Sequence, residues 1–188
     1  MKACLSGMAC TLLVVAALPV AAQQSLVPAQ SEIAFTSTQM GVPVQGRFKR
    51  FNAQVAFDPK KLESSRIAFA IDVASASFGV AELDAEVTGP AWFDAKRFPQ
   101  ATFQSSAVKE TGNGKFDVVG KLTIKGSVRD LVVPVAVAQS ATGTTATGAF
   151  AIKRLDFAIG DGDWKDTSMV SNEVQVKFKL LLTGTAAK

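Results

Sequence analysis

The densest group of chemically reactive side chains is the acidic segment 160–166, which reads Gly-Asp-Gly-Asp-Trp-Lys-Asp. Closely spaced carboxylates in a loop can coordinate calcium when further oxygen ligands follow at fixed positions. Counted from Asp161, an EF-hand loop needs an oxygen ligand where Lys165 stands and a glutamate where Asn172 stands. Because both requirements fail, the sequence predicts a tight turn with exposed carboxylates rather than a metal site.

Residues that commonly perform catalysis are scarce. The sequence has no His and no Tyr, and its two cysteines, Cys4 and Cys10, lie near the N-terminus. The chain therefore lacks histidine, which is the commonest general base and a common zinc ligand. Beyond the first ten residues it also lacks cysteine, which provides the thiolate nucleophile and the other common zinc ligand. No Gly-x-Ser-x-Gly motif occurs either. The composition predicts a binding protein rather than an enzyme, although carboxylate, lysine or serine chemistry stays open.

Phenylalanine is abundant, with 13 residues in the chain. A Phe-rich interior without phenolic hydroxyls offers a polar ligand few partners. A long hydrocarbon would gain about 0.8 kcal/mol for each methylene that it buries there. The same rings could instead pack against one another as an ordinary β-sandwich core, and residue type alone does not decide between these interpretations.

The N-terminus has the pattern of a secretory signal peptide. Lys2 precedes an apolar run at 12–20, which is too short to cross a bilayer as a helix, and small residues follow up to Ala22. We expect cleavage after Ala22 to remove segment 1–22, including both cysteines. The remaining 166 of 188 residues carry 19 basic and 16 acidic side chains, a net charge of +3. Segment 23–188 is long enough to form one domain without disulfides.

The charge pattern argues against nucleic-acid binding. Basic residues are never more than two in a row and are interleaved with acidic ones, whereas a nucleic-acid groove needs a denser basic stripe. The pI of about 9.2 is compatible with a mild attraction to anionic surfaces or head groups.

From residue 31 onward, apolar side chains recur mostly at every second position, which is typical of strands with one buried and one solvated face. In the stretch 66–73, for example, Ile67, Phe69 and Ile71 share one face. Eight such strands can close into an antiparallel barrel. We predict them at 33–37, 44–57, 66–73, 101–108, 116–124, 131–137, 146–153 and 174–183, with a further short strand at 155–159.

Two irregularities within these strands predict local distortions. The apolar parity changes inside 44–57, and a β-bulge at Lys49-Arg50 would restore the register and bend the strand. Gly120 occupies the inner face of its strand, which predicts a sharp bend or the close approach of another group. Residues 112–114, Gly-Asn-Gly, are expected to form a hairpin turn.

The strand period is lost around residues 80–98, where we predict a short helical insertion. Segment 81–87 should form a helix that stops at Gly89-Pro90, and segment 92–99 a further helical turn.

Four blocks of residues, in this order and spacing, are shared with a known family: 44–48 (VQGRF) leading to 57–59 (FDP); 92–99 (WFDAKRFP) followed by 103–106 (FQSS); 120–126 (GKLTIKG); and 154–157 (RLDF) with 170–174 (VSNEV). Together they resemble the YceI family of periplasmic, lipocalin-like polyisoprenoid-binding proteins. The resemblance implies an extended eight-stranded antiparallel barrel, located in the periplasm, whose apolar tunnel holds an isoprenoid or similar long-chain lipid. It implies no catalysis and no cofactor other than a bound isoprenoid lipid or quinone.

The resemblance also directs the choice of ligand-binding residues. Many relatives have histidines near the first strand and after the Leu-Thr-Ile triplet, where this chain has Gln39 and Lys125, so a head-group contact made by those histidines is not carried over. We expect Trp92, Phe93 and Trp164 to lie near the ends of the tunnel. The other candidate ligand-binding side chains are Phe35, Phe48, Phe69, Ile71, Phe103, Leu122, Ile124, Phe157 and Phe178.

The expected partner is a long-chain isoprenoid, either a polyprenyl lipid or an isoprenoid quinone. Three alternatives remain: a carrier of fatty acids or fatty amides, a lipid-modifying enzyme, and a protein–protein module with a filled barrel. A carrier would also make transient contact with a membrane or with membrane redox proteins. Free edge strands or the mouth of the barrel could pair two copies into a homodimer.

Overall fold

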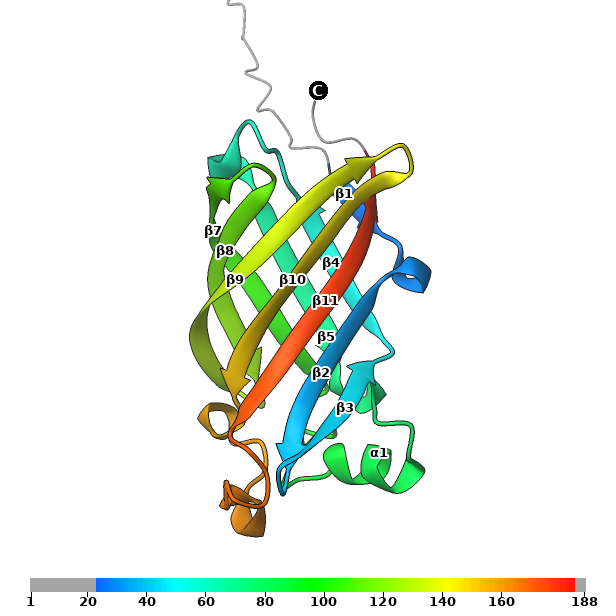
Figure 1. Ribbon diagram of the computed structural model, residues 1–188, viewed down its shortest axis with the longest axis vertical. Coiled ribbons are helices and arrows are strands. Elements are labelled where there is room, and N and C mark those ends of the chain that lie inside the picture. Colours follow the sequence, from blue (N-terminus) through cyan, green and yellow to red (C-terminus); the bar gives the residue numbers. More distant parts are fainter. Residues whose placement is uncertain (1–22, 185–188) are drawn as a thin grey trace, which may run out of the picture.

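The computed structural model describes residues 23–184, which form an elongated antiparallel barrel (Figure 1). The predicted signal peptide, 1–22, lies outside the described residues. The strands are β1 (Gln23–Leu26), β2 (Glu32–Gln39), β3 (Val42–Phe48), β4 (Phe51–Ala56), β5 (Arg66–Asp72), β6 (Ala76–Ser77), β7 (Gln100–Gly112), β8 (Lys115–Ile124), β9 (Ser127–Ser140), β10 (Gly143–Lys153) and β11 (Glu173–Thr183).

The barrel closes through three strands that are each interrupted once. β11 pairs with β2 over its first half and with β1 at its end, so β1 and β2 follow one another along it. In the same way β3 pairs with β2 while β4 pairs with β1. The two-residue β6 pairs with β3 as β5 pairs with β4, so β5 and β6 also follow one another. When β1 and β2, β3 and β4, and β5 and β6 each count as one strand, the barrel has eight antiparallel strands, which confirms the predicted fold class.

The parity change predicted inside 44–57 lies where the chain leaves β3 and begins β4. Lys49 and Arg50 drop out of the ladder there, and Ser75 provides new partners for their backbone. The Lys49 N–H donates to the Ser75 carbonyl at 3.1 Å, and the Arg50 N–H donates to the Ser75 hydroxyl at 2.9 Å. The irregularity is therefore at the predicted position, but it separates two strands instead of forming a bulge within one.

Gly120 of β8 is explained by a close approach, as predicted. The ring of Phe103, on the neighbouring strand β7, lies over Gly120, and a Cβ at this position would be 2.6 Å from Cζ of that ring. It would also overlap the carbonyl oxygen of Gln104. Glycine at this position therefore leaves room for the Phe103 ring against β8.

The helical insertion is confirmed over its first part by helix α1 (Ala81–Val87), which ends before Gly89 as predicted. Asp84 attaches the helix to β6. Its carboxylate accepts hydrogen bonds from the Ser77 hydroxyl at 2.7 Å and from the backbone N–H of Phe78 at 2.6 Å. This carboxylate therefore fixes the position of α1 at the lower end of the barrel in Figure 1.

Two expected elements are wrong, for the same physical reason. Segment 92–99 forms hydrogen-bonded turns instead of a helical turn, and segment 155–159 is a 3-10 helix (Arg154–Phe157) instead of a strand. Asp94 and Ala158 have positive φ angles of 49° and 52°. Neither a helix nor a strand continues through the left-handed region, so the apolar spacing in these two segments does not reflect a regular element.

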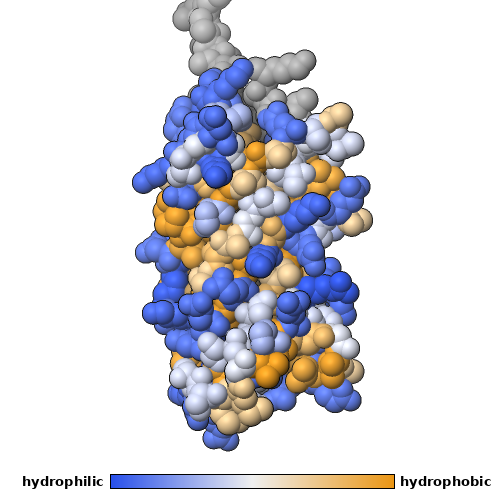
Figure 2. Space-filling view, viewed as in Figure 1, coloured by the Kyte–Doolittle hydropathy of each residue, from blue (hydrophilic) through white to orange (hydrophobic). Residues whose placement is uncertain are grey.

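The outer surface of the barrel is largely polar. Exposed ion pairs such as Lys121 to Asp130, at 2.7 Å, join neighbouring strands. Figure 2 shows hydrophobic residues in several groups on this face, one of them at the lower end, over β3 and α1. The exposed apolar side chains at this end include Met40, Val42 and Val80.

Candidate functional site

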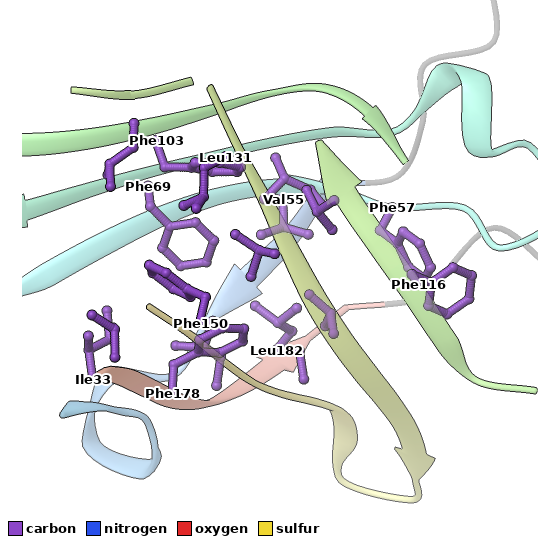
Figure 3. Close-up of a pocket in the computed structure, with 18 of the residues that line it drawn as sticks. Ile33, Val55, Phe57, Phe69, Phe103, Phe116, Leu131, Phe150, Phe178 and Leu182 are labelled. Carbon is purple, nitrogen blue, oxygen red and sulfur yellow. The ribbon is translucent and has the colours of Figure 1, made fainter. Parts of the chain in front are cut away.

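A cavity of about 140 Å³ lies inside the barrel and is lined by inward-facing side chains of β1, β2, β4, β5 and β7 to β11; we call it the Gln24 chamber. The rings of Phe57 and Phe116 face each other in a T-shaped pair at one end of it, with centroids 5.0 Å apart (Figure 3). Polar side chains in the lining are confined to Gln24, Thr102 and Thr144, and no charged side chain is among them. The chamber therefore suits a hydrocarbon.

Phenylalanine rings in this chamber are less buried than core residues normally are. Phe69, Phe103, Phe150 and Phe178 line the cavity, and each keeps an intermediate exposed fraction (Figure 3). Inward-facing rings in a close-packed core would be surrounded by neighbours on all sides. Their remaining surface faces the cavity instead, so the barrel interior is hollow.

A second cavity, of about 190 Å³, lies at the lower end of the barrel in Figure 1; we call it the Trp92 chamber. Strand ends, α1 and the segments 88–99 and 154–172 surround it. Its lining is more polar than that of the Gln24 chamber, because Ser37, Gln39, Glu86 and Arg154 take part in it. Strand residues, together with Phe57 directly after β4, build the first chamber, whereas loops and a helix complete the second.

The two chambers adjoin, because six residues belong to the lining of both. These residues come from β2, β5, β7, β8, β10 and β11 and therefore surround the junction on several sides. They are Ile33, Ile71, Ala101, Leu122, Phe150 and Val176. All six are apolar, so the junction between the two cavities presents no polar barrier to a hydrocarbon.

The structure places eleven of the twelve candidate ligand-binding side chains on these linings. Ile71 and Leu122 belong to both chambers; Phe69, Phe103 and Phe178 line the Gln24 chamber; Phe35, Phe48, Trp92, Phe93, Ile124 and Trp164 line the Trp92 chamber. Phe157 lines neither chamber. It is 3% exposed and packs in a buried cluster with Val73 and Ile159. Contact of these side chains with a ligand remains a prediction.

Arg154 is a residue of this site whose role the sequence did not indicate. It is 1% exposed, and no carboxylate among residues 23–184 pairs with it. All its hydrogen bonds go to backbone carbonyls: Nε donates to Ser171, and the two terminal nitrogens donate to Ile159, Gly160, Trp164 and Val170. Burial lowers the pKa of the guanidinium below its ordinary value. Arg154 therefore holds segment 154–172 together, and its donors are not free to bind a head group.

Lys125 makes a similar connection. Its Nζ donates to the carbonyls of Pro90 and Ala158, both at 2.8 Å, and so joins the segment after α1 to the segment after β10. Gln39, by contrast, lines the Trp92 chamber. Lys125 therefore has a structural role, and Gln39 remains available at the cavity.

Two buried polar groups in the chambers have no hydrogen-bond partner in the described chain. One is the side-chain amide of Gln24, and the other is Nε1 of Trp92. The Trp92 ring packs on Trp164, with centroids 5.3 Å apart, and on the guanidinium of Arg154. The sequence alone does not indicate Gln24, because β1 has only four residues, too few for an alternating pattern.

Other reactive groups do not form a second site. Asp161 pairs with Lys165 at 2.8 Å, and this contact lowers the pKa of the Asp161 carboxyl. Ser106 and Lys109 have a Ser-x-x-Lys spacing, but both side chains are exposed. Within residues 23–184, no three His, Cys, Asp or Glu side chains are grouped to hold a metal ion, and no helix is long and apolar enough to cross a membrane.

The architecture is shared with known proteins. BcnA of Burkholderia cenocepacia is 48% identical, with a TM-score of 0.82 over 84% of this chain and 99% of that one. A polyisoprenoid binding domain from Saccharophagus degradans has the same fold at 18% identity, with a TM-score of 0.71 over 86% of this chain and 98% of the domain. A UPF0312 protein of Vibrio parahaemolyticus is 32% identical over 106 residues, which cover 56% of each chain, so this chain spans little more than half the length of that relative.

The family model described as the YceI-like domain matches residues 25–182. Of the residues in strands, only the first two of β1 and the last one of β11 lie outside this match. The match covers most of the chain, and it agrees with the hollow barrel. This protein therefore belongs to the YceI-like family.

Proposed function

We propose that this protein binds a long-chain isoprenoid, either a polyprenyl lipid or an isoprenoid quinone, and carries it through the periplasm. The observation that carries this proposal is the apolar path formed by the two adjoining chambers. Each methylene buried there would contribute about 0.8 kcal/mol, so a chain that extends through both chambers binds more tightly than one confined to either. The polyisoprenoid binding domain from Saccharophagus degradans, which shares this fold, supports the same ligand class.

The mechanism is partition into a preformed cavity. Apolar surface drives uptake, and the closed barrel shields the chain from water. No cation in the Gln24 chamber could balance the charge of an ionised carboxylate or phosphate, because its lining has no charged side chain. A fatty acid would therefore have to keep its carboxylate in the Trp92 chamber, whereas an uncharged isoprenoid could occupy both.

We infer that the ligand enters through the Trp92 chamber. Glu86 on its lining is exposed, and Gln39 is partly exposed. The neighbouring turn between β2 and β3 carries exposed Met40 and Val42, an apolar surface from which a lipid could pass to or from a membrane. Contact with a membrane or with membrane redox proteins, and pairing of two copies into a homodimer, remain predictions.

Extraction of the purified protein with organic solvent, followed by mass spectrometry, tests the ligand class. We expect a long-chain isoprenoid at a stoichiometry near one per chain. A fatty acid or fatty amide in its place would be identified by mass and would establish the alternative carrier. Absence of any lipid, together with no uptake of added prenols or quinones, would refute the proposal.

The location has its own test. N-terminal sequencing of protein recovered from the periplasmic fraction should give a chain that begins at Gln23. Recovery of the uncleaved chain from the cytoplasm would contradict the predicted export.

A further inference from the structure

Gln24 is an unusual residue for the wall of an apolar cavity. It is 2% exposed, and neither Nε2 nor Oε1 has a hydrogen-bond partner in the described chain. It lies in β1 opposite Val55 of β4 and lines the Gln24 chamber among aliphatic and aromatic side chains. A buried amide without partners destabilises the folded protein, whereas an apolar side chain of the same size would carry no such penalty.

We propose that Gln24 is a ligand contact, and that an uncharged hydrogen-bonding group of the ligand lies against its amide. This inference rests on the proposed function and adds the orientation of the ligand. The polar group leads into the barrel, and the hydrocarbon chain extends back through the junction toward the Trp92 chamber. The free protein keeps an unpaired amide that the bound ligand pairs.

The chemistry of the chamber specifies the class of this group. Its lining has no cation to balance a phosphate or carboxylate and no anion to balance an amine. Gln24 supplies both a donor and an acceptor, so a group that also does both matches it best. A primary alcohol, a phenolic hydroxyl or an amide can both donate and accept a hydrogen bond, whereas a quinone carbonyl can only accept one.

The opposite orientation has its own candidate contact. Nε1 of Trp92, at the other end of the path, is also buried without a partner. It is a donor only, so it could pair with an acceptor but not with a hydroxyl hydrogen. The two orientations therefore place the polar group next to different residues, and substitutions can separate them.

The test compares two probes in three proteins. The probes are geranylgeraniol and the hydrocarbon with the same chain but no hydroxyl, and the proteins are the wild type, Gln24→Met and Trp92→Phe. Methionine keeps the length of the glutamine side chain without its amide. We expect the ratio of alcohol affinity to hydrocarbon affinity to fall about 3- to 10-fold in Gln24→Met, as for the loss of a hydrogen bond, and to stay unchanged in Trp92→Phe.

An unchanged ratio in Gln24→Met would overturn the inference, as would a fall in Trp92→Phe alone. Binding of neither probe to the wild type would refute the proposed function itself, and the inference with it. Thermal unfolding of the ligand-free proteins gives an independent result. Gln24→Met should unfold at a higher temperature than the wild type, because it removes an unpaired buried amide. A lower unfolding temperature would mean that the amide is paired in the free protein and would overturn the inference.

Discussion

The two ends of the tunnel are built by different interactions. Apolar side chains on alternating strand positions form the Gln24 chamber, and the wall needs no polar contact of its own. In the Trp92 chamber, Arg154, Lys125 and Asp84 each attach a loop or helix to the barrel through backbone groups. The Gln24 chamber therefore depends on apolar packing, and the Trp92 chamber depends on a few polar connections. Substitutions at the two ends should for this reason have different effects on stability and on ligand binding.

Replacement of Arg154 should have the largest effect on stability. Arg154→Met leaves carbonyls of segment 159–171 without donors in a buried site. We expect the free energy of unfolding to fall by about 3–5 kcal/mol, as measured by urea denaturation. Arg129→Met is the matched control, because the Arg129 guanidinium lies exposed over the Phe157 ring, 5.9 Å from its centroid, and should contribute less than about 1 kcal/mol. Equal losses in the two variants would contradict the role of Arg154.

Blocking the junction should separate the two chambers. Ala101 is 5% exposed and lines both cavities, so Ala101→Phe would place a ring between them. We expect affinity for geranylgeraniol to fall about 100-fold, as for the loss of roughly three buried methylenes. A shorter prenol that fits one chamber should lose little affinity. Ala149→Phe, on an exposed position of β10, controls for the added ring. If both prenols lost affinity equally in Ala101→Phe, the chambers would not form one path.

The sequence predicted the strand-built end much better than the loop-built end. Alternation assigns each residue of a strand to one face, so the inward positions of Phe69 and Phe178 followed from local pattern alone. Glycine on the inner face at position 120 indicated either a bend or a neighbour that needs the space, and the structure shows the neighbour. Spacing cannot show whether such a barrel is hollow, because the volume enclosed depends on how the strands tilt.

The loop-built end lacks such a pattern. Apolar spacing at 155–159 suggested a strand, yet the backbone there is set by the bonds of Arg154 to carbonyls up to 17 residues away. These partners come together only after the loop has closed, and no local rule identifies them. Phe157, which the resemblance nominated as a ligand contact, belongs to this segment and packs in the core instead.

Crowding at Gly120 should have an intermediate effect confined to the strand-built end. Gly120→Ala adds a methyl group that overlaps the Gln104 carbonyl and the Phe103 ring, and we expect a loss of about 2 kcal/mol in urea denaturation. Gly112→Ala is the control, because nothing lies within 4 Å of the added Cβ. A loss in Gly112→Ala as large as that in Gly120→Ala would show that glycine flexibility, not crowding, matters.

Acid should loosen the loop-built end first, through Asp84. The backbone N–H of Phe78, the Ser77 hydroxyl and the charge of Lys49 lower the pKa of the Asp84 carboxyl below its ordinary value of 3.8. Because the folded pKa is the lower one, the carboxylate stabilises the folded state fully above the ordinary value. This contribution disappears as the pH falls below about 4 toward the lowered pKa, and α1 should then separate more easily from β6.

Tryptophan fluorescence can measure this smallest effect, because both tryptophans of the chain, Trp92 and Trp164, line the Trp92 chamber. In the wild type, we expect the emission to change on acidification before the far-UV circular dichroism of the barrel does. Asp84→Asn should show part of this change already at neutral pH and a smaller change on acidification, because the amide cannot carry the charge that the bonds from Ser77 and Phe78 favour. Asp130→Asn, at an exposed ion pair on β9, should titrate like the wild type. If the curves of tryptophan emission against pH were the same for Asp84→Asn and the wild type, other carboxyls at this end would cause the acid response. Asp84 would then have no larger effect than the exposed control, Asp130.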